Sequence, residues 1–365
     1  MEKEELLAVL RLQVTKNIGD IIAKKLIQHF SSATAIFKAK KTELLKIDGI
    51  GEFIINHLLD EKNIKKAEAE LNYIQNNNIE YYYFLEDTYP QKLKHCIDAP
   101  ILMFKDGNIN LSHQKIISIV GTRNITSYGR DFCNHLIDDL TKYNPIIVSG
   151  FAYGVDICGH KAAVKNKLQT IGVFAHGLDV VYPKVHKKYM APILENGGFL
   201  TEFWHDETPL RENFLKRNRI VAGMSQATII IESGEKGGSL VTANIANSYH
   251  KDVFALPGKT TDVYSKGCNN LIKNNQAHLL TSAEDIVKML NWDIPEQQPV
   301  QQTELFIELD EKEQKVYDYL LENGKQLLDV IAIDCNIPTY QLSSVLMQME
   351  LKGVVKPHPG KIFAV

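Results

Sequence analysis

The chain has 365 residues, of which 44% are hydrophobic and 23% are charged. This length suits two or three domains, and this composition excludes a largely disordered chain. No apolar run approaches the roughly 18–20 residues of a membrane-spanning helix, and the acidic N-terminus shows no secretory signal. Five scattered cysteines form no Cys-x-x-Cys pair, which argues against a disulfide framework and a zinc finger. We therefore expect a cytoplasmic protein without membrane contact.

Charge is distributed unevenly along the chain, although the net charge is only −3. Residues 112–290 carry 20 Lys and Arg against 16 Asp and Glu, whereas residues 291–365 carry 6 against 12. A polyanionic partner therefore suits the middle of the chain and does not suit its end. Unequal solvated surfaces are the alternative explanation.

Residues 1–70 have helical apolar periodicity throughout and form the first predicted module. Within it, Gly49-Ile50-Gly51 separates two predicted helices, and Asn17-Ile18-Gly19 is a weaker copy of the same pattern. Glycine-hydrophobic-glycine between helices resembles the helix-hairpin-helix motif, whose exposed backbone N–H groups meet a phosphate at a helix N-terminus. A tight turn in a small helical bundle is the alternative.

Residues 71–291 change to an alternation of short apolar strands with helices. This alternation predicts an α/β fold with a mostly parallel, doubly wound sheet of the extended Rossmann-like class. In that architecture the ligand site lies beyond the carboxyl ends of the strands. The predicted strands are Ile79–Leu85, Ile116–Val120, Pro145–Ser149, Thr170–Ala175, Gly198–Glu202, Ala227–Glu232 and Asp252–Leu256.

Glycine turns follow four of these strands. Such turns expose backbone N–H groups beside the positive ends of helix dipoles, so they predict an anion-binding edge of the sheet. One of the four is His176-Gly177, and the other three supply the candidate phosphate contacts. These candidates are Gly121, Thr122, Gly150, Gly154, Gly238 and Ser239.

The motifs of common cofactor sites do not occur in this sequence. The dinucleotide fingerprint Gly-x-Gly-x-x-Gly and the P-loop pattern are both absent. No zinc-protease motif, paired Cys/His set or nucleophile elbow is present. We therefore expect no cofactor, no metal and no enzymatic activity, and we interpret Ser239 as a phosphate-binding hydroxyl.

The densest charged segment of the chain has four cations in nine residues, with Phe214 among them. Cations follow a nucleic-acid backbone while an aromatic face stacks a base, so this composition predicts a site for single-stranded nucleic acid. The alternatives are ion pairs of the last two arginines with Glu202 or Glu232, and a core contact for the phenylalanine. The four cations are Arg211, Lys216, Arg217 and Arg219.

Residues 292–309 are rich in proline and glutamine and are predicted to form a linker. Beyond them, residues 310–365 predict three helices and a small hairpin, which is a winged-helix arrangement. The third helix of such modules often contacts DNA. Here it carries no Lys or Arg before Lys352, so a protein contact or a structural role is equally open. The helices are expected at Glu311–Asn323, Leu327–Cys335 and Thr339–Leu351.

The middle module closely resembles the bacterial DNA-processing protein A family, also called DprA or Smf. The matching motifs keep their order and spacing from Ile119 to Ile272. The flanking modules also look like those of longer family members. The motifs are Ile119–Arg123 with Tyr128-Gly129, Ser149–Asp156 with His160, Gly177–Pro183, Phe214, Arg217–Ser225, Gly238–Ala243, Pro257-Gly258 and Gly267–Ile272.

The resemblance implies a Rossmann-like domain that binds single-stranded DNA without cleaving it. It also implies loading of a RecA-type recombinase during natural transformation, and self-association into homodimers. By position in the motifs, phosphates would be held at a helix N-terminus by Gly238, Ser239 and Thr242. The implied DNA pocket consists of Arg123, Lys184, Arg211, Phe214, Arg217 and Arg219.

The same resemblance places a dimer contact near Asn270–Leu280, for which exposed Leu271 and Ile272 are candidates. Core packing is the alternative for both side chains. Two positions depart from the family pattern. Family members often have Lys or Arg where this chain has Tyr153, and many have threonine where it has His176. A stacking or hydrogen-bonding tyrosine and a structural histidine are the interpretations that we favour.

The rival hypothesis is a nucleotide-processing enzyme, because a sheet with a Gly-Gly-Ser/Thr turn also resembles phosphoribohydrolases of the LOG type. Those enzymes carry a catalytic glutamate shortly after the glycine turn. This chain has Asn244, Ile245 and Ala246 where that glutamate would stand. Release of free base from AMP would favour the rival.

Overall fold

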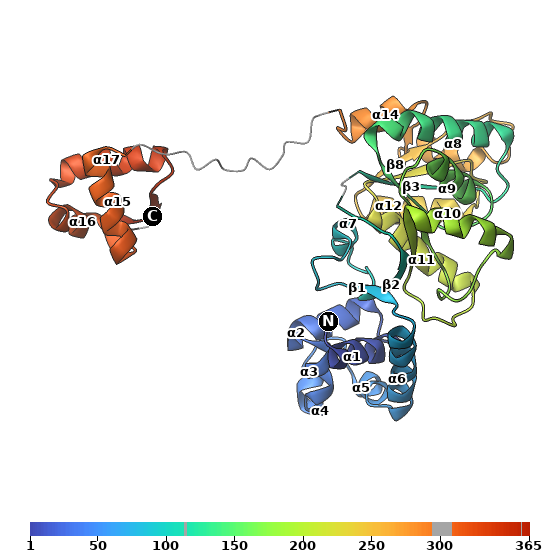
Figure 1. Cartoon of the computed structure of the whole chain (residues 1–365), viewed down its shortest axis with the longest axis horizontal. Coiled ribbons are helices and arrows are strands. Elements are labelled where there is room, and N and C mark those ends of the chain that lie inside the picture. The colour runs from blue at the N-terminus through green and yellow to red at the C-terminus, as the bar shows by residue number, and fades with distance from the viewer. Residues whose placement is uncertain (113–114, 294–308, 359) are drawn as a thin grey trace. The chain divides into compact units, whose positions relative to one another are not determined.

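The computed structural model describes residues 1–112, 115–293, 309–358 and 360–365. The chain forms two compact units, Met1–Ile294 and Pro295–Val365 (Figure 1). Most of the predicted linker 292–309 lies outside the described residues. Trp292, however, is buried in the core of the first unit, so that unit extends past the predicted boundary at residue 291. Among the described residues, no helix combines the length and the apolar character needed to cross a membrane.

The first unit begins with six helices that pack around their apolar faces. Ser32 caps the third helix by accepting a hydrogen bond from the Ala35 N–H, and Asp60 caps the sixth in the same way. The sixth helix runs through the predicted boundary at residue 70, and one continuous core joins these helices to the strands that follow. The helices are α1 (Lys3–Val14), α2 (Asp20–Phe30), α3 (Ala33–Lys38), α4 (Lys41–Leu44), α5 (Glu52–Leu58) and α6 (Glu61–Asn76).

The rest of this unit is built on a nine-stranded sheet with the order β1-β2-β6-β5-β4-β3-β7-β8-β9. The seven strands from β6 to β9 in this order are parallel, whereas β1 and β2 add an antiparallel extension at one edge. The predicted α/β class with a mostly parallel sheet is confirmed. The strands are β1 (Glu80–Tyr83), β2 (Leu102–Gly107), β3 (Ile116–Gly121), β4 (Ile146–Ser149), β5 (Thr170–Val173), β6 (Gly197–Thr201), β7 (Ala227–Ile231), β8 (Asp252–Ala255) and β9 (His278–Leu279).

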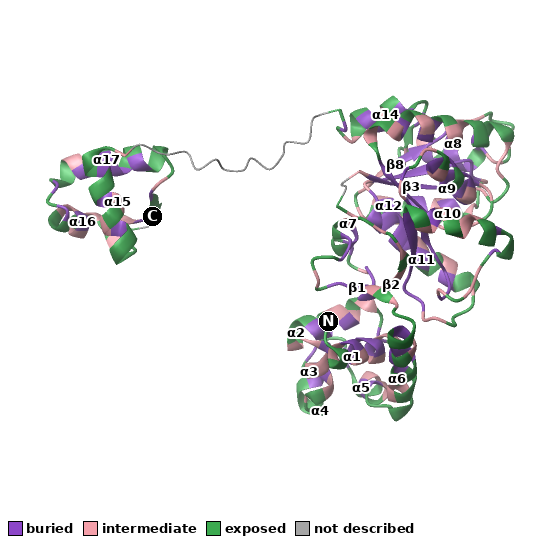
Figure 2. Cartoon of the chain, in the orientation of Figure 1, coloured by how far each residue is buried: buried purple, intermediate pink, exposed green. Residues whose placement is uncertain are grey.

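Helices cover both faces of the sheet because its strands are apolar on both faces. On β3, Ile117 and Ile119 share one core cluster with α8, α9 and α14, while Ile116 and Val120 share another with α11 and α12. Figure 2 shows the strands as buried and the outer faces of the helices as exposed. The covering helices are α8 (Ser127–Leu140), α9 (Val155–Lys165), α10 (Met190–Glu195), α11 (Arg211–Met224), α12 (Gly238–Ser248), α13 (Lys266–Lys273) and α14 (Ala283–Met289).

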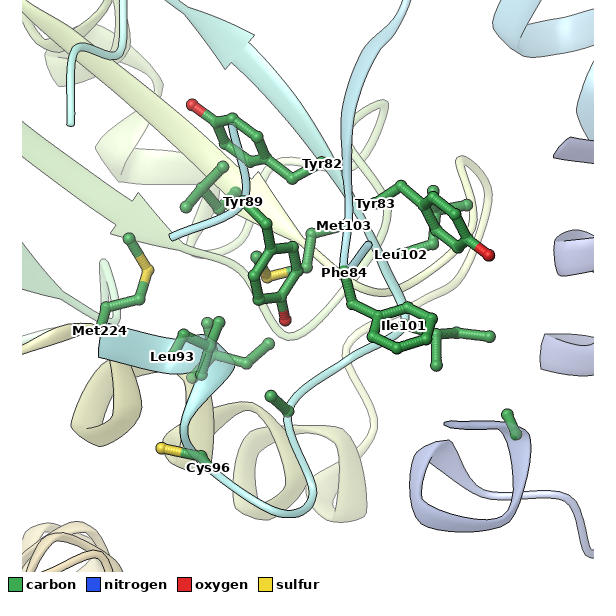
Figure 3. Packing of buried hydrophobic residues seen from close by; sticks show 14 of the residues in the cluster. Tyr82, Tyr83, Phe84, Tyr89, Leu93, Cys96, Ile101, Leu102, Met103 and Met224 are labelled. Carbon is green, nitrogen blue, oxygen red and sulfur yellow. The ribbon is translucent and has the colours of Figure 1, made fainter. Parts of the chain in front are cut away.

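The antiparallel extension packs against the end of α11 through an aromatic cluster (Figure 3). Tyr82 and Met103 come from β1 and β2, Leu93 comes from the short helix α7 (Gln91–Lys94), and Met224 ends α11. The buried hydroxyl of Tyr89 donates a hydrogen bond to the Pro100 carbonyl at 2.7 Å. This cluster anchors the C-terminal end of the helix that carries most of the predicted DNA-binding residues.

The order of the strands reverses at β3. The chain proceeds from β3 to β4, β5 and β6 on one side, and then returns to place β7 on the other side of β3. The loops after β3 and β7 therefore diverge at the carboxyl edge of the sheet, and a crevice opens where doubly wound folds bind their ligands.

The second unit contains the predicted three helices and the hairpin, with an additional short strand. Val316, Leu320, Ile331, Leu342 and Leu346 form its apolar core. The observed helices are α15 (Glu311–Asn323), α16 (Leu328–Asp334) and α17 (Thr339–Leu351). The strands are β10 (Gln326–Leu327), β11 (Lys356–His358) and β12 (Ile362–Ala364), in the order β10-β12-β11.

Candidate nucleic-acid interface

A crevice with a volume of about 530 Å³ lies at the reversal of strand order. Its walls come from the loops after β3, β4 and β7 and from the sides of α11 and α12. These segments are far apart in the sequence and meet because parallel strands end at one edge. Of the residues predicted from the sequence, the crevice is lined by Gly121, Thr122, Arg123, Gly150, Arg211, Phe214, Arg217, Gly238, Ser239 and Thr242.

The floor of the crevice is the guanidinium group of Arg217. This side chain is 4% exposed, and its Nη1 donates a hydrogen bond to the Val173 carbonyl at 2.5 Å. A Cβ atom at Gly150 would lie 2.0 Å from that Nη1, so only glycine lets the guanidinium pack there. Burial lowers the pKa of Arg217 to about 10, although the nearby carboxylate of Asp156 acts in the opposite direction. Arg217 therefore holds the β4 and β5 ends together beneath the crevice.

Two of the accessible cations of the crevice are Arg123 and Arg211, which are both exposed. Neither forms an ion pair with any residue in the described ranges. Phe214 on α11 is half-buried in the same crevice, and the guanidinium carbon of Arg123 lies 5.4 Å from its ring centroid. Tyr182 contacts the same ring edge-on at 5.7 Å. These two arginines and the exposed Lys236 thus give the crevice accessible positive charge beside an aromatic ring.

The N-terminus of α12, a helix that packs against α11, forms another part of the crevice wall. The first N–H groups of a helix have no acceptor within the helix, and they carry the positive end of its dipole. A Cβ atom at Gly238 would meet nothing within 4 Å, so a ligand can approach the backbone there. The Ser239 hydroxyl donates to Ser233 Oγ at 2.9 Å, and that hydroxyl in turn donates to the Gly234 carbonyl. In this arrangement the backbone N–H groups, rather than the Ser239 hydroxyl, are the donors open to an anion.

Thr122 and Gly154 hold the loop after β3 in place. The Thr122 N–H donates to the Glu232 carbonyl at 2.7 Å, and the Thr122 carbonyl accepts from the Val155 N–H at 3.1 Å. Gly154 has φ +77° and would place a Cβ 2.2 Å from the Thr122 carbonyl oxygen, so glycine is required. Gly154 lines a neighbouring pocket rather than the crevice itself.

The prediction that Arg219 belongs to the DNA pocket is not supported by its position. Its Nη2 lies 2.5 Å from Glu202 Oε2 and 3.1 Å from Asp20 Oδ2, and its Nη1 donates to the Asp98 carbonyl. Burial alone would lower its pKa, but these oxygens outweigh burial and the pKa of Arg219 is raised. The ion-pair alternative applies to this arginine, with Glu202 as the partner. Glu232 instead accepts hydrogen bonds from Thr126 at the start of α8.

Lys184 and the predicted dimer residues also differ from expectation. Lys184 is exposed at the start of the 3₁₀ segment Lys184–Tyr189 and does not line the crevice. Leu271 is 4% exposed within the core, and Ile272 is partly buried against the same core. Core packing, which was the alternative for both, describes them better than a dimer contact does.

The two departures from the family pattern have separate structural roles. Tyr153 is 43% exposed and lies outside the crevice, against His186. His176 is buried and stacks on Phe174, and burial lowers its pKa. A structural histidine is therefore the interpretation that the structure supports.

Lys236 and Asn218 are among the crevice residues that sequence reasoning did not select as site residues. Lys236 lies in the loop after β7, and Asn218 lies one turn beyond Phe214 on α11. The helical spacing from Arg211 through Phe214 to Asn218 was the available signal for the second. No group of three or more His, Cys, Asp or Glu suited to a metal ion occurs in the part of the chain that the structure describes.

These features define a class of protein, a Rossmann-like fold with a crevice lined by arginines and a helix N-terminus at its switch point. Residues 80–291 match the model of the DNA recombination-mediator protein A family, and residues 301–361 match the DprA winged helix domain. The chain belongs to this family.

Relatives and solved structures agree with this assignment. Protein Smf of Escherichia coli is 32% identical over 307 residues, which cover 81% of this chain and 80% of the relative. DprA of Streptococcus pneumoniae is 38% identical over 203 residues, which cover 56% of this chain and 71% of the relative. The X-ray structure of the S. pneumoniae protein aligns with a TM-score of 0.66 at 29% identity, over 79% of this chain and 98% of that one. A Helicobacter pylori DprA structure, described as giving insight into its single-stranded DNA binding mode, aligns with a TM-score of 0.53 at 31% identity. The alignment covers 59% of this chain and 97% of that one.

Proposed function

We propose that this chain binds single-stranded DNA in the crevice, independently of sequence and without catalysis. The observation that carries the proposal is that Arg123 and Arg211, which have no ion-pair partner among the described residues, line the same crevice as the Phe214 ring. Guanidinium groups bind phosphates of any sequence, and every base has a face that stacks on an aromatic ring. A duplex hides these faces, so the site favours an unpaired strand.

The composition of the crevice supports binding without bond cleavage. Its lining includes one carboxylate, Asp156, which is buried beside Arg217, and it includes no histidine or cysteine. Ser233 and Ser239 bond to each other and to a backbone carbonyl, with no base to activate either hydroxyl. The LOG-type alternative gains no support, because Asn244, Ile245 and Ala246 lie on α12 where its glutamate would be needed.

Family membership extends the proposal to the biological process. The S. pneumoniae and Bacillus subtilis relatives are DNA processing proteins, and the H. pylori relative binds single-stranded DNA. We infer that this chain delivers the bound strand to a RecA-type recombinase in natural transformation and acts as a homodimer. The edge strand β9 with its exposed Leu279 supports self-association better than Leu271 or Ile272 does.

The test is a salt titration of oligothymidine binding followed by fluorescence anisotropy. Arg123→Ala and Arg211→Ala should each weaken binding and reduce the log–log salt slope by about 0.7, the value for one lost phosphate contact on a single strand. Lys142→Ala is the matched control. This exposed lysine precedes β4, at the opposite edge of the parallel sheet. Equal slopes for all three variants and wild type would show that the strand binds elsewhere.

A further inference from the structure

A second pocket, of about 430 Å³, adjoins the crevice. Arg123 and Asn124 line both cavities, so they form the ridge between them. The second pocket is otherwise built from α8, α9 and the segment Lys184–Tyr189, which contribute little to the crevice. A strand that leaves the crevice over Arg123 would enter it directly.

The lining of this pocket is strongly cationic. Besides Arg123 it includes Arg130, Lys161 and Lys188, which are all exposed. No Asp or Glu lines it, and none of its four cations has an ion-pair partner within the ranges that the structure covers. Their charge is therefore available to an anionic ligand.

Aromatic rings form one wall of the same pocket. Its centre is the buried imidazole of His186, whose Nδ1 lies 3.0 Å from the Phe151 carbonyl. Tyr153 packs edge-on against this imidazole at 5.0 Å, and Tyr189 does so at 6.0 Å. The hydrogen bond and the ring contacts hold Tyr153 in place while leaving it 43% exposed. The wall thus offers a preformed stacking surface beside the cations.

We propose that this pocket binds the continuation of the single strand held in the crevice, with Arg123 contacting the backbone between the two. The inference rests on the proposed function and extends its site. The pocket repeats the chemistry of the crevice, with unpaired cations and an accessible ring. It lacks the carboxylates that would read base edges or ribose hydroxyls, so it suits any sequence. Tyr153, which departs from the family pattern, is the stacking residue of this second segment.

Oligonucleotide length separates the two pockets experimentally. Binding of (dT)4 and (dT)12 would be measured for wild type, Arg211→Ala and the double variant Lys161→Ala/Lys188→Ala. We expect the double variant to bind (dT)4 within about twofold of wild type. For (dT)12 we expect it to bind about tenfold more weakly, with a salt slope reduced by about 1.4 for two lost contacts. Arg211→Ala should weaken binding at both lengths.

The matched control is Lys142→Ala/Lys187→Ala, which removes the same charge from two exposed lysines that line neither cavity. It should resemble wild type at both lengths. If the pocket and control variants bind (dT)12 equally well, the second pocket is not part of the strand path, while the crevice remains supported by Arg211→Ala. If wild type binds neither oligonucleotide, both proposals fail.

Photochemical crosslinking gives a readout that does not depend on variant stability. A single 5-iododeoxyuridine is placed at successive positions of (dT)12, and the crosslinked residues are identified by mass spectrometry. We expect one position to crosslink to Phe214 or Tyr182 and a position further along the strand to crosslink to Tyr153 or Tyr189. Crosslinks to Phe214 or Tyr182 at some position, with none to the second pair at any position, would overturn the inference.

Discussion

The two sides of α11 put similar residues to different uses. On the crevice side, exposed Arg211 has no ion-pair partner among the described residues, and the Nε of buried Arg217, which lines the same crevice, has no hydrogen-bond partner among them. On the opposite side, Arg219 and Lys216 share the carboxylate of Glu202 at 2.5 and 2.9 Å. One side therefore keeps its positive charge available, and the other neutralises it inside the protein.

This difference follows from helix geometry. Successive residues turn by about 100°, so Arg217 and Arg219 point about 200° apart and cannot line the same cavity. Arg211, Phe214 and Asn218 repeat at spacings of three and four and form one stripe along the crevice. The function of an arginine on α11 therefore cannot be assigned from residue type alone. It depends on which side of the helix the arginine occupies and on whether a carboxylate lies next to it.

The largest expected effect is a loss of stability when Arg219 is removed from the side of α11 that contacts Glu202. Arg219→Ala removes the buried partner that Glu202 and Asp20 share and leaves Glu202 only the more exposed Lys216, so we expect the unfolding free energy to fall by about 3–5 kcal/mol. Denaturant titration measures this loss. Arg211→Ala is the control and should change stability by no more than about 0.5 kcal/mol, because its side chain is exposed. Comparable stabilities of the two variants would remove the contrast between the sides.

A smaller loss of folding stability is expected from Gly150→Ala. The new methyl group would lie 2.0 Å from Arg217 Nη1 and would displace the guanidinium from the Val173 carbonyl. Overpacking of this kind costs about 1–3 kcal/mol. Gly238→Ala is a matched control, because open space surrounds that position. Thermal unfolding of both variants tests this, and an unchanged melting temperature for Gly150→Ala would mean that Arg217 tolerates a different position.

On the crevice side, removal of the ring should act on affinity and leave the fold intact. Phe214→Ala should weaken oligothymidine binding by about 1–3 kcal/mol per stacked base. Phe214→Tyr keeps an aromatic face and should restore most of the affinity, whereas Phe214→Leu keeps apolar area without a ring and should not. Anisotropy titrations compare the three variants. Equal affinities for Leu and Tyr at this position would exclude stacking as the source of binding.

Much of this architecture could be predicted from the sequence because it depends on local patterns. Apolar runs marked β3 to β8, and helical periodicity placed α15 and α17 at their observed bounds. β9 has only two residues, and β2 is a short apolar run followed by Lys-Asp-Gly, so neither gave a clear signal. Both are defined by their neighbours in the sheet.

The candidate site was predictable where one motif or one helix supplies it and not where distant segments meet. A motif after β3 supplies Arg123, one helix supplies Arg211 and Phe214, and all three line the crevice. The internal role of Arg219 depends on Asp20, about two hundred residues earlier in the chain, in a module that the sequence presented as separate. The second pocket could not be predicted from the sequence for the same reason. Its cations Arg130, Lys161 and Lys188 belong to three elements that no motif connects.

The smallest expected effect is on the pH dependence of stability, and it concerns the buried histidine His160. His160 is fully buried, and its Nδ1 lies 2.7 Å from Thr170 Oγ1, whose own hydrogen is donated to the Ile147 carbonyl. The Nδ1–H of His160 is therefore the donor in this hydrogen bond. Burial lowers the pKa of His160 to about 3, and the positive charges of His186 and Arg217 add to this effect.

In the unfolded chain the same histidine has its ordinary pKa of about 6.5, so the unfolded state binds more protons at mildly acidic pH. Stability should fall as pH decreases through 6.5 toward 3, and this residue alone should contribute about 0.7 kcal/mol between pH 7 and pH 6. His160→Gln keeps a donor for Thr170 without a titrating group, so its unfolding free energy should depend less on pH by that amount. The same dependence in both proteins would mean that His160 takes up a proton in the folded state as readily as in the unfolded chain, which its burial and the positive charge of Arg217 disfavour.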